Sequence, residues 1–292
     1  MSRDEAHRKW GHPHHNQMQK MANHYRVQLT GKLGSCTGCG LIKSRAHSTT
    51  KTCHKKSTAN GERLFIDTTG PYPKSCGGMK YCMCTVDDKS DKTWTHFAPS
   101  KGHMIIFVRD LVTLINGLEL KVKYIRCDNA GEHQHQLQEF CNEKGITLEY
   151  TAPNTPQQNS RVEKKIHTLW QRNMTQMVHA NLSIETQNKF WAESMSCANY
   201  HEDLVIKAGR SEPALQVWTG LDVSKWFKKL VEFGRVGIVT KRVKFSGKMA
   251  EKGYPALMVG YAMNHRPGVY KVYNPKTNRI VLTHDVTWTD FK

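Results

Sequence analysis

Three acidic residues stand out in this basic chain because of where they lie in its sequence pattern. Asp67 lies within the apolar run RLFIDTT, Asp128 ends the run KYIRCD, and Glu163 begins a strongly periodic segment. If they converge at one edge of a mixed sheet, their mutual repulsion must be offset. Mg²⁺ or Mn²⁺ offsets such repulsion through oxygen ligands, and two ions about 4 Å apart are suited to phosphoryl transfer.

Taken singly, most acidic residues only meet solvent or cap a turn. Asp87 and Asp88 end a strand beside Lys89 and are expected to form such a turn. The three carboxylates above differ from that background in their order, their spacing and their surroundings.

A second constellation lies near the N-terminus. His7 and His12 are separated by four residues, Cys36 and Cys39 by two, and twenty-three residues lie between the pairs. Zinc prefers four tetrahedral nitrogen and sulfur ligands, and a C-x-x-C pair presents two thiolates to one ion. A module of roughly fifty residues scarcely builds a core, so a structural metal would stabilise it. The alternative is a chance C-x-x-C beside a His-rich segment.

The charge of the chain points to polyanionic partners. It carries 43 Lys and Arg against 25 Asp and Glu, a formal net charge of +18. Nucleic acid is the common polyanion for such a surface. A structural basic protein is the alternative explanation.

Composition also limits the cellular context. No apolar run is long enough for a membrane span, and the polar N-terminus has no signal-peptide core. Nine cysteines, an odd number, indicate a reducing compartment. Six isolated cysteines are interpreted as small core residues: Cys76, Cys82, Cys84, Cys127, Cys141 and Cys197.

The elements that must position these groups form an α/β pattern. Strands are predicted near 63–69, 80–88, 93–99, 121–128 and 146–152, and helices near 101–117, 133–144, 157–180 and 187–202. From 233 onward short strands alternate with Gly and Pro turns, and the turn NPKTNR predicts a hairpin. The predicted domains are a zinc module (1–45), a linker (46–60), a catalytic core (61–205), a basic connector (206–232) and a small β module (233–292).

Several polar and basic side chains are candidates for DNA contact. The loop before Glu163 offers Asn154, Gln157, Gln158 and Asn159, and a helix N-terminus there would favour phosphate. A plain helix-entry loop is the alternative. The remaining candidates are cationic: Lys164, Lys165, Lys228, Lys229, Lys241 and Arg242.

Aromatic residues interleave with two of these basic runs. Trp226 and Phe227 lie in KWFKK, and Phe245 lies in KRVKFSGK. Such interleaving fits backbone contacts with stacking support. We assign these aromatic residues and Trp288 to the core and the lysines to DNA.

Three blocks resemble the catalytic blocks of Ty1/copia-type retrotransposon integrases: LFIDTTGP, IRCDNAGEH and TAPNTPQQNSRVEKKIHTLW. The segment HRKWGH…CTGCGLIKSRAH is similar to the zinc segment that precedes the integrase in that family. The similarity continues through FWAESMSCANY, LQVWTG, ALMVGYA and GVYKVYNPKTNRIVLTHDV, and so covers nearly the entire chain.

The resemblance implies a ribonuclease H-like mixed sheet with flanking helices, preceded by the zinc module and followed by the β module. It transfers the family's catalytic and Mg²⁺-binding triad to Asp67, Asp128 and Glu163, and its zinc ligands to His7, His12, Cys36 and Cys39. The implied cofactors are two Mg²⁺ (or Mn²⁺) ions and one structural Zn²⁺.

The implied reaction is end processing where required, then strand transfer of element DNA into target DNA. The implied partners are those two DNAs, further copies of the chain and a host chromatin factor, with no membrane. The implied location is the nucleus, with assembly in cytoplasmic virus-like particles. Family members lie within a longer Gag-Pol polyprotein.

The chain departs from the family pattern near the third block. Ser160 replaces a usual Gly, Val162-Glu163-Lys164 replaces a common Ala-Glu-Arg, and thirty-four residues, one fewer than usual, separate Asp128 from Glu163. A loop absorbs one missing residue cheaply. Two alternatives stay open: an inactive, domesticated DNA-binding or interaction protein with this fold, and another ribonuclease H-like nuclease or transposase.

Overall fold

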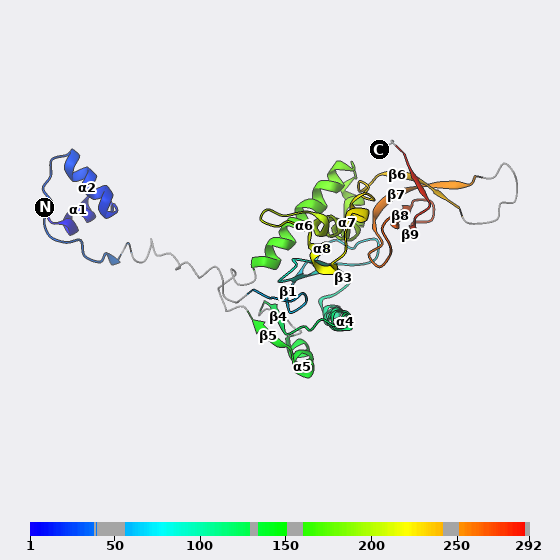
Figure 1. Ribbon diagram of the computed structural model, residues 1–292. Coiled ribbons are helices and arrows are strands. Elements are labelled where there is room, and N and C mark those ends of the chain that lie inside the picture. The colour runs from blue at the N-terminus through cyan, green and yellow to red at the C-terminus, as the bar shows by residue number, and fades with distance from the viewer. Residues whose placement is uncertain (38, 40–55, 129–133, 151–159, 242–250, 290–292) are drawn as a thin grey trace. The chain divides into compact units, whose positions relative to one another are not determined.

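A computed structural model describes residues 1–37, 39, 56–128, 134–150, 160–241 and 251–289 (Figure 1). The chain divides into two compact units, Met1–Lys51 and Thr52–Lys292. The first holds two helices, α1 (Arg3–Lys9) and α2 (His15–His24). The Ser2 hydroxyl caps α1 by accepting a hydrogen bond from the Glu5 backbone N–H, so local sequence sets where this helix begins.

The second unit contains a mixed five-stranded sheet in the order β3-β2-β1-β4-β5. Its strands are β1 (Arg63–Thr69), β2 (Tyr81–Asp87), β3 (Thr93–Ala98), β4 (Tyr124–Cys127) and β5 (Thr147–Tyr150). The first three strands pair antiparallel, whereas β4 pairs parallel with both β1 and β5. The predicted mixed sheet is therefore confirmed.

Alternation along β1 decides which helices cover which face of this sheet. Leu64 and Ile66 pack with α4 (Met104–Gly117) and α5 (Gln134–Lys144), which follow the short 3₁₀ helix η1 (Lys101–His103). Phe65 lies in a different apolar cluster, with residues of α6 (Ser160–His179) and α7 (Ile184–Leu204). Because side chains alternate faces along a strand, Asp67 belongs to the α6 side.

A second five-stranded sheet, antiparallel throughout, follows two short helices, α8 (Ala214–Thr219) and α9 (Ser224–Phe227). Its strands run in the order β10-β6-β7-β8-β9: β6 (Val236–Thr240), β7 (Gly253–Tyr261), β8 (Tyr270–Asn274), β9 (Arg279–Thr283) and β10 (Val286–Trp288). The predicted hairpin is confirmed, because Asn274 pairs with Arg279 across the turn.

The two sheets share one apolar core. Helix α7 packs against β7, where the rings of Tyr200 and Tyr261 stack with centroids 4.1 Å apart. Phe190 on the same helix meets Tyr273 of β8 edge to face, at 4.9 Å. The β module and the catalytic core, which the sequence divided at a connector, therefore lie within a single compact unit.

Burial agrees with most of the core assignments. Cys82, Cys84, Cys141 and Cys197 are buried, whereas Cys76 and Cys127 are only partly covered. Trp226 and Trp288 are half-buried against the core, but Phe227 is 64% exposed. The assignment of Phe227 to the core was therefore wrong, because its four-residue helix α9 has no buried residue. Phe245 lies outside the described residues.

Candidate active site

Asp67 stands near the end of β1, beside the parallel strand β4. Phe65 pairs with Arg126 in the register of these two strands, so two residues further along Asp67 stands opposite Asp128. Asp67 is half-buried, and its Oδ1 accepts a hydrogen bond of 2.7 Å from the Thr68 backbone N–H. Parallel pairing thus brings two of the three predicted acids to the same edge of the sheet.

Glu163 reaches this edge from the first turn of α6, which packs against β1 and β2. The pKa of Asp67 is raised to about 6, first by its burial and then by the negative charges of Glu163 and Asp128. The structure therefore brings all three predicted carboxylates within electrostatic range of one another. Glu163 and Asp128 themselves are exposed to solvent.

The donor set fits hard divalent cations, because it consists of carboxylate oxygens that repel one another. Burial is the largest cause of the raised pKa of Asp67, and the negative charges of Glu163 and Asp128 add to it. Among the described residues the three carboxylates do not come together as closely as the ligands of a closed metal site do.

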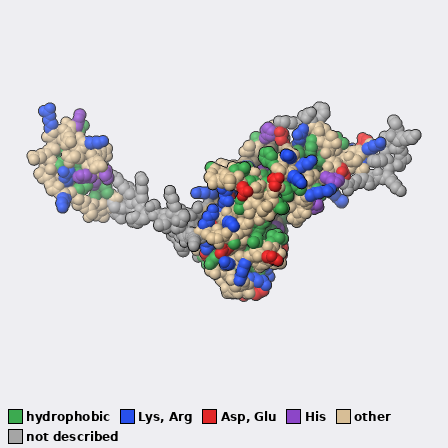
Figure 2. Space-filling view, viewed as in Figure 1, with side chains coloured by type: hydrophobic (Ala, Val, Ile, Leu, Met, Phe, Trp, Pro, Cys, Tyr) green, Lys and Arg blue, Asp and Glu red, His purple; other side chains and the backbone are tan. Residues whose placement is uncertain are grey.

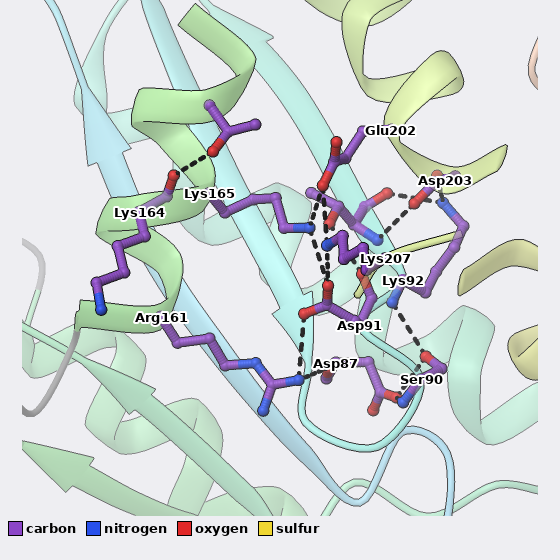
Figure 3. A network of polar contacts seen from close by, with 12 residues as sticks. Asp87, Ser90, Asp91, Lys92, Arg161, Lys164, Lys165, Glu202, Asp203 and Lys207 are labelled. Atoms are coloured by element: carbon purple, nitrogen blue, oxygen red, sulfur yellow. Dashed lines mark hydrogen bonds and ion pairs between the residues drawn. The ribbon is translucent and has the colours of Figure 1, made fainter. Parts of the chain in front are cut away.

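A network of ion pairs joins α6 to the β2–β3 turn and to the end of α7 (Figure 3). Asp91 accepts hydrogen bonds from Arg161 at 3.2 Å and from Lys165 at 3.1 Å, and it also pairs with Lys207. Glu202 pairs with Lys165 at 3.0 Å and with Lys207 at 2.8 Å. Burial opposes ionisation of Asp91, but these three cations hold its pKa well below its usual value.

Lys165 corrects a prediction from the sequence. We expected it on the exposed side of α6 as a phosphate contact, yet it is 5% exposed and neutralises two acids. Its place on the helix explains the result. Lys165 lies four residues after Arg161, so both side chains share the face that meets the β2–β3 turn. Lys164, the residue just before Lys165, is exposed, as predicted.

The β2–β3 turn is the part of the site that sequence reasoning missed. Asp87 and Asp88 do form a turn, as predicted, but both are fully buried. Asp87 accepts hydrogen bonds from the backbone N–H groups of Gly61 and Ser90 and from the Ser90 hydroxyl. Asp88 pairs with Arg161. The run DDKSDK, with three acids in five residues of a basic chain, was the signal available for this network.

A shallow pocket of about 440 Å³ opens where this network meets solvent. Its charged lining comprises two acids and five cations: Asp91, Glu202, Arg161, Lys164, Lys165, Arg172 and Lys207. Five positive charges against two negative ones leave a surplus that attracts anions.

The other predicted DNA contacts have mixed outcomes. Lys228 and Lys229 are exposed, whereas Lys241 is half-buried and pairs with Glu251 at 3.8 Å. Five candidates lie outside the described residues: Asn154, Gln157, Gln158, Asn159 and Arg242. Lys and Arg side chains are spread over the visible face of the second unit (Figure 2).

The first unit holds the second predicted site. His7, His12, Cys36 and Cys39 place one ligand atom each within 4.8 Å of one another. Cys36 Sγ lies 3.4 Å from His12 Nδ1, and Cys39 Sγ lies 3.3 Å from His7 Nε2. Hydrogen bonding to the Cys39 backbone and then to His7 lowers the pKa of Cys36 to about 6. This donor set, two thiols and two imidazoles, fits tetrahedral zinc.

A further contact orients one of these ligands. The other ring nitrogen of His7, Nδ1, lies 3.1 Å from the Pro13 carbonyl oxygen. An imidazole that ligates a metal commonly donates its second N–H in this way, which fixes the tautomer and the ring orientation. The buried His7 is thus prepared to present Nε2 to an ion.

Comparison with known proteins agrees with this architecture. Residues 238–291 match the family described as the retroviral polymerase SH3-like domain. The chain is 27% identical over 78% of its length to the retrovirus-related Pol polyprotein from transposon TNT 1-94 of Nicotiana tabacum. It is 22% identical over 97% of its length to the Pol polyprotein from transposon RE1 of Arabidopsis thaliana. The chain spans 17% and 19% of these two relatives.

The chain is similar to integrases of the retrotransposon type. Its fold also matches a chain in the cryo-EM structure of the simian T-cell lymphotropic virus intasome in complex with PP2A regulatory subunit B56 gamma. That match has a TM-score of 0.52 and 12% identity, and it covers 92% of this chain and 91% of the other. The mixed α/β fold of this chain is therefore similar to that of a chain in a retroviral intasome. Within the described ranges, no helix combines the length and apolar character needed to cross a bilayer.

Proposed function

We propose that this chain is a retrotransposon integrase that joins element DNA to target DNA by two-metal phosphoryl transfer. The observation that carries the proposal is that Asp128, just after β4, and Glu163, on α6, lie within electrostatic range of Asp67 on β1, in a relative of retrotransposon Pol polyproteins. Two divalent cations held by these carboxylates would stabilise charge on the attacking and leaving oxygens.

The joining step is a transesterification. The 3′ hydroxyl oxygen of element DNA bonds to a phosphorus atom of the target, and the bond from that phosphorus to the target's own 3′ oxygen breaks. The attacking hydroxyl loses its proton to solvent, and the leaving oxygen gains one. The role of this chain's carboxylates is to hold negative charge at a fixed edge of the sheet.

The basic surface supports binding of both DNAs. The pocket at the ion-pair network contributes Lys164 and Arg172, and the exposed Lys228 and Lys229 add charge near the second sheet. Polyanions gain affinity there through release of counterions. We extend the proposal to assembly of several copies, to a host chromatin factor and to action in the nucleus, where target DNA lies.

We also propose that His7, His12, Cys36 and Cys39 hold one structural zinc ion. The four ligand atoms are close enough for a single ion, and a unit of this size has little core of its own. Ala6, Met18 and Ala22 are its fully buried apolar residues among those described.

The test of the enzymatic proposal uses the purified full chain with zinc bound. A labelled duplex carrying the terminal repeat of the encoding element is incubated with plasmid target and Mg²⁺ or Mn²⁺. We expect joined products with the wild-type chain and none with Asp128→Asn, which keeps the shape of the side chain and removes its charge.

Three results would contradict the proposal. Joining by Asp128→Asn at the wild-type rate would show that the carboxylates do not support the chemistry. Specific binding of the terminal duplex without any joined or processed product would instead favour the inactive DNA-binding protein. Cleavage without joining would favour a nuclease of the same fold.

A further inference from the structure

The residues that stand two positions before the three carboxylates come together in the folded chain. Phe65, Arg126 and Arg161 each stand two residues before Asp67, Asp128 and Glu163. In the folded chain these three preceding residues meet. The guanidinium carbon of Arg126 lies 5.8 Å from the centroid of the Phe65 ring, and that of Arg161 lies 5.5 Å from it.

Phe65, Arg126 and Arg161 form a supporting layer. Its two strand residues come from β1 and β4 and lie in register. Phe65 of β1 pairs with Arg126 of β4. Residues two apart on a strand share a face, so Phe65 lies one step along the same face of β1 from Asp67, and Arg126 lies two residues before Asp128, which follows the end of β4. Phe65 is 1% exposed and Arg126 is 8% exposed, which means that water screens their contact poorly.

The helix contributes the third member in a different way. Residues two apart on a helix point in nearly opposite directions, so the bonds of Arg161 fix how α6 is rotated and leave Glu163 on the open side. Arg161 pairs with Asp88 and Asp91 of the β2–β3 turn. Lys165, one turn further on, binds the same Asp91 and shares this task.

Each guanidinium is also held from the side away from the ring contact by a carboxylate. Glu149 of β5 accepts hydrogen bonds from Arg126 at 2.8 and 2.9 Å, and from Arg63 at 3.0 Å. The fork of an arginine can bond a carboxylate and lie over an aromatic ring at the same time. Three separate elements, β1, β4 and α6, are thereby tied to one ring.

We infer that Phe65, Arg126 and Arg161 are positioning residues that hold Asp67, Asp128 and Glu163 ready for shared divalent cations. The inference rests on the proposed function and deepens it. Three mutually repelling carboxylates cannot hold one another in place, so their geometry has to come from the supporting layer.

The test measures Mn²⁺ binding to the full, zinc-loaded chain by electron paramagnetic resonance of the free ion, without any DNA. Arg161→Lys keeps the charge but loses the planar fork, and loss of such a supporting contact weakens metal affinity by about 10-fold or more. The matched control is Arg109→Lys, whose guanidinium carbon lies 5.5 Å from the centroid of the Phe140 ring, in the apolar cluster on the other face of the sheet. It should bind Mn²⁺ as the wild type does.

Phe65→Leu is the second variant, since it keeps an apolar side chain and removes the ring. We expect both variants to bind Mn²⁺ more weakly than the wild type. The melting temperature of Arg161→Lys should change little. The Arg161 side chain is 27% exposed, so this variant tests the layer even where Phe65→Leu fails to fold. Wild-type Mn²⁺ affinity in a folded Arg161→Lys protein would overturn the inference.

The Asp128→Asn variant separates this result from the proposed function. If it binds Mn²⁺ as the wild type does, the carboxylates hold no cation, and the proposed function falls together with the inference. If Asp128→Asn loses Mn²⁺ while Arg161→Lys keeps it, the cation site stands and only the supporting layer is refuted.

Discussion

The two candidate metal sites differ in how closely the chain brings their ligand groups together without a metal ion. In the N-terminal unit, the four zinc ligands gather within 4.8 Å of one another. At the edge of the first sheet, the carboxylates of Asp67, Asp128 and Glu163 come only within electrostatic range. The difference follows from ligand chemistry. Thiols and imidazoles hydrogen-bond to each other, as Cys36 does with His12, whereas carboxylates only repel.

The same contrast explains where each site obtains its rigidity. A zinc ion bound at the first site would hold a small unit together, so the ligands and the fold of that unit would depend on each other. The carboxylate site is built on a sheet with two covered faces and is backed by ion pairs around Asp91 and Glu202. Removing metal should therefore unfold the first unit and leave the second intact.

The largest effect should come from Cys36→Ser. Structural zinc contributes roughly 10–16 kcal/mol of apparent binding free energy in small zinc modules, so the first unit should lose its fold. Hydrogen exchange should show unprotected amides in α1 and α2 and unchanged protection in α7. Cys76→Ser, at a half-buried thiol of the second unit, is the control. Full protection of α1 in Cys36→Ser would show that zinc does not hold this unit.

Asp91→Asn should have the next largest effect. It leaves Arg161, Lys165 and Lys207 around a neutral amide, and breaking a buried ion pair typically costs about 3–5 kcal/mol of unfolding free energy. Denaturant unfolding followed by tryptophan fluorescence measures the loss. Asp110→Asn, at an exposed position of α4, should change stability by less than about 0.5 kcal/mol.

The pH dependence of this difference has a defined sign. The pKa of Asp91 is lowered below 3.8 on folding, so the carboxylate stabilises the folded chain above pH 3.8. That contribution is lost as the pH falls further, and the gap between Asp91→Asn and wild type should narrow with it. A gap that stays constant into strong acid would mean that the Asp91 charge is not its cause.

The sequence predicted the features that local patterns set, but not those that depend on contacts between distant residues. Local patterns predicted the strand of Asp67, the helix of Glu163 and the hairpin after Asn274, because periodicity and turn residues act over a few positions. The burial of Lys165 was not predictable in this way. Its partners, Asp91 and Glu202, lie 74 and 37 residues away, and only the packing of α6 against α7 and the β2–β3 turn brings them together.

Asp67→Asn should stabilise the second unit while it abolishes joining. The pKa of Asp67 rises from 3.8 to about 6 on folding, so its charge opposes folding at neutral pH when no cation is present. The amide oxygen can still accept the Thr68 hydrogen bond. We expect a gain on the order of 1–3 kcal/mol above pH 6 that disappears below pH 3.8.

Thermal unfolding without added divalent cations measures this gain, and added Mg²⁺ should then raise the melting temperature of the wild type but not of Asp67→Asn. The control is Asp222→Asn, at an exposed loop position where the pKa is lowered by hydrogen bonds from Ser224. That variant should not be stabilised. A destabilised Asp67→Asn would mean that neither burial nor the neighbouring carboxylates penalise the charge of Asp67 in the folded chain.

The smallest effect separates two neighbouring lysines. Lys164 is exposed and lines the pocket at the ion-pair network, so Lys164→Gln should leave the melting temperature unchanged. It should weaken binding to any DNA duplex and reduce the slope of log affinity against log salt by about 1, the value for one lost phosphate contact. Lys165→Gln should instead lower stability, because Asp91 and Glu202 lose a buried partner. Equal salt slopes for wild type and Lys164→Gln would mean that Lys164 neutralises no phosphate. The DNA would then bind away from this pocket.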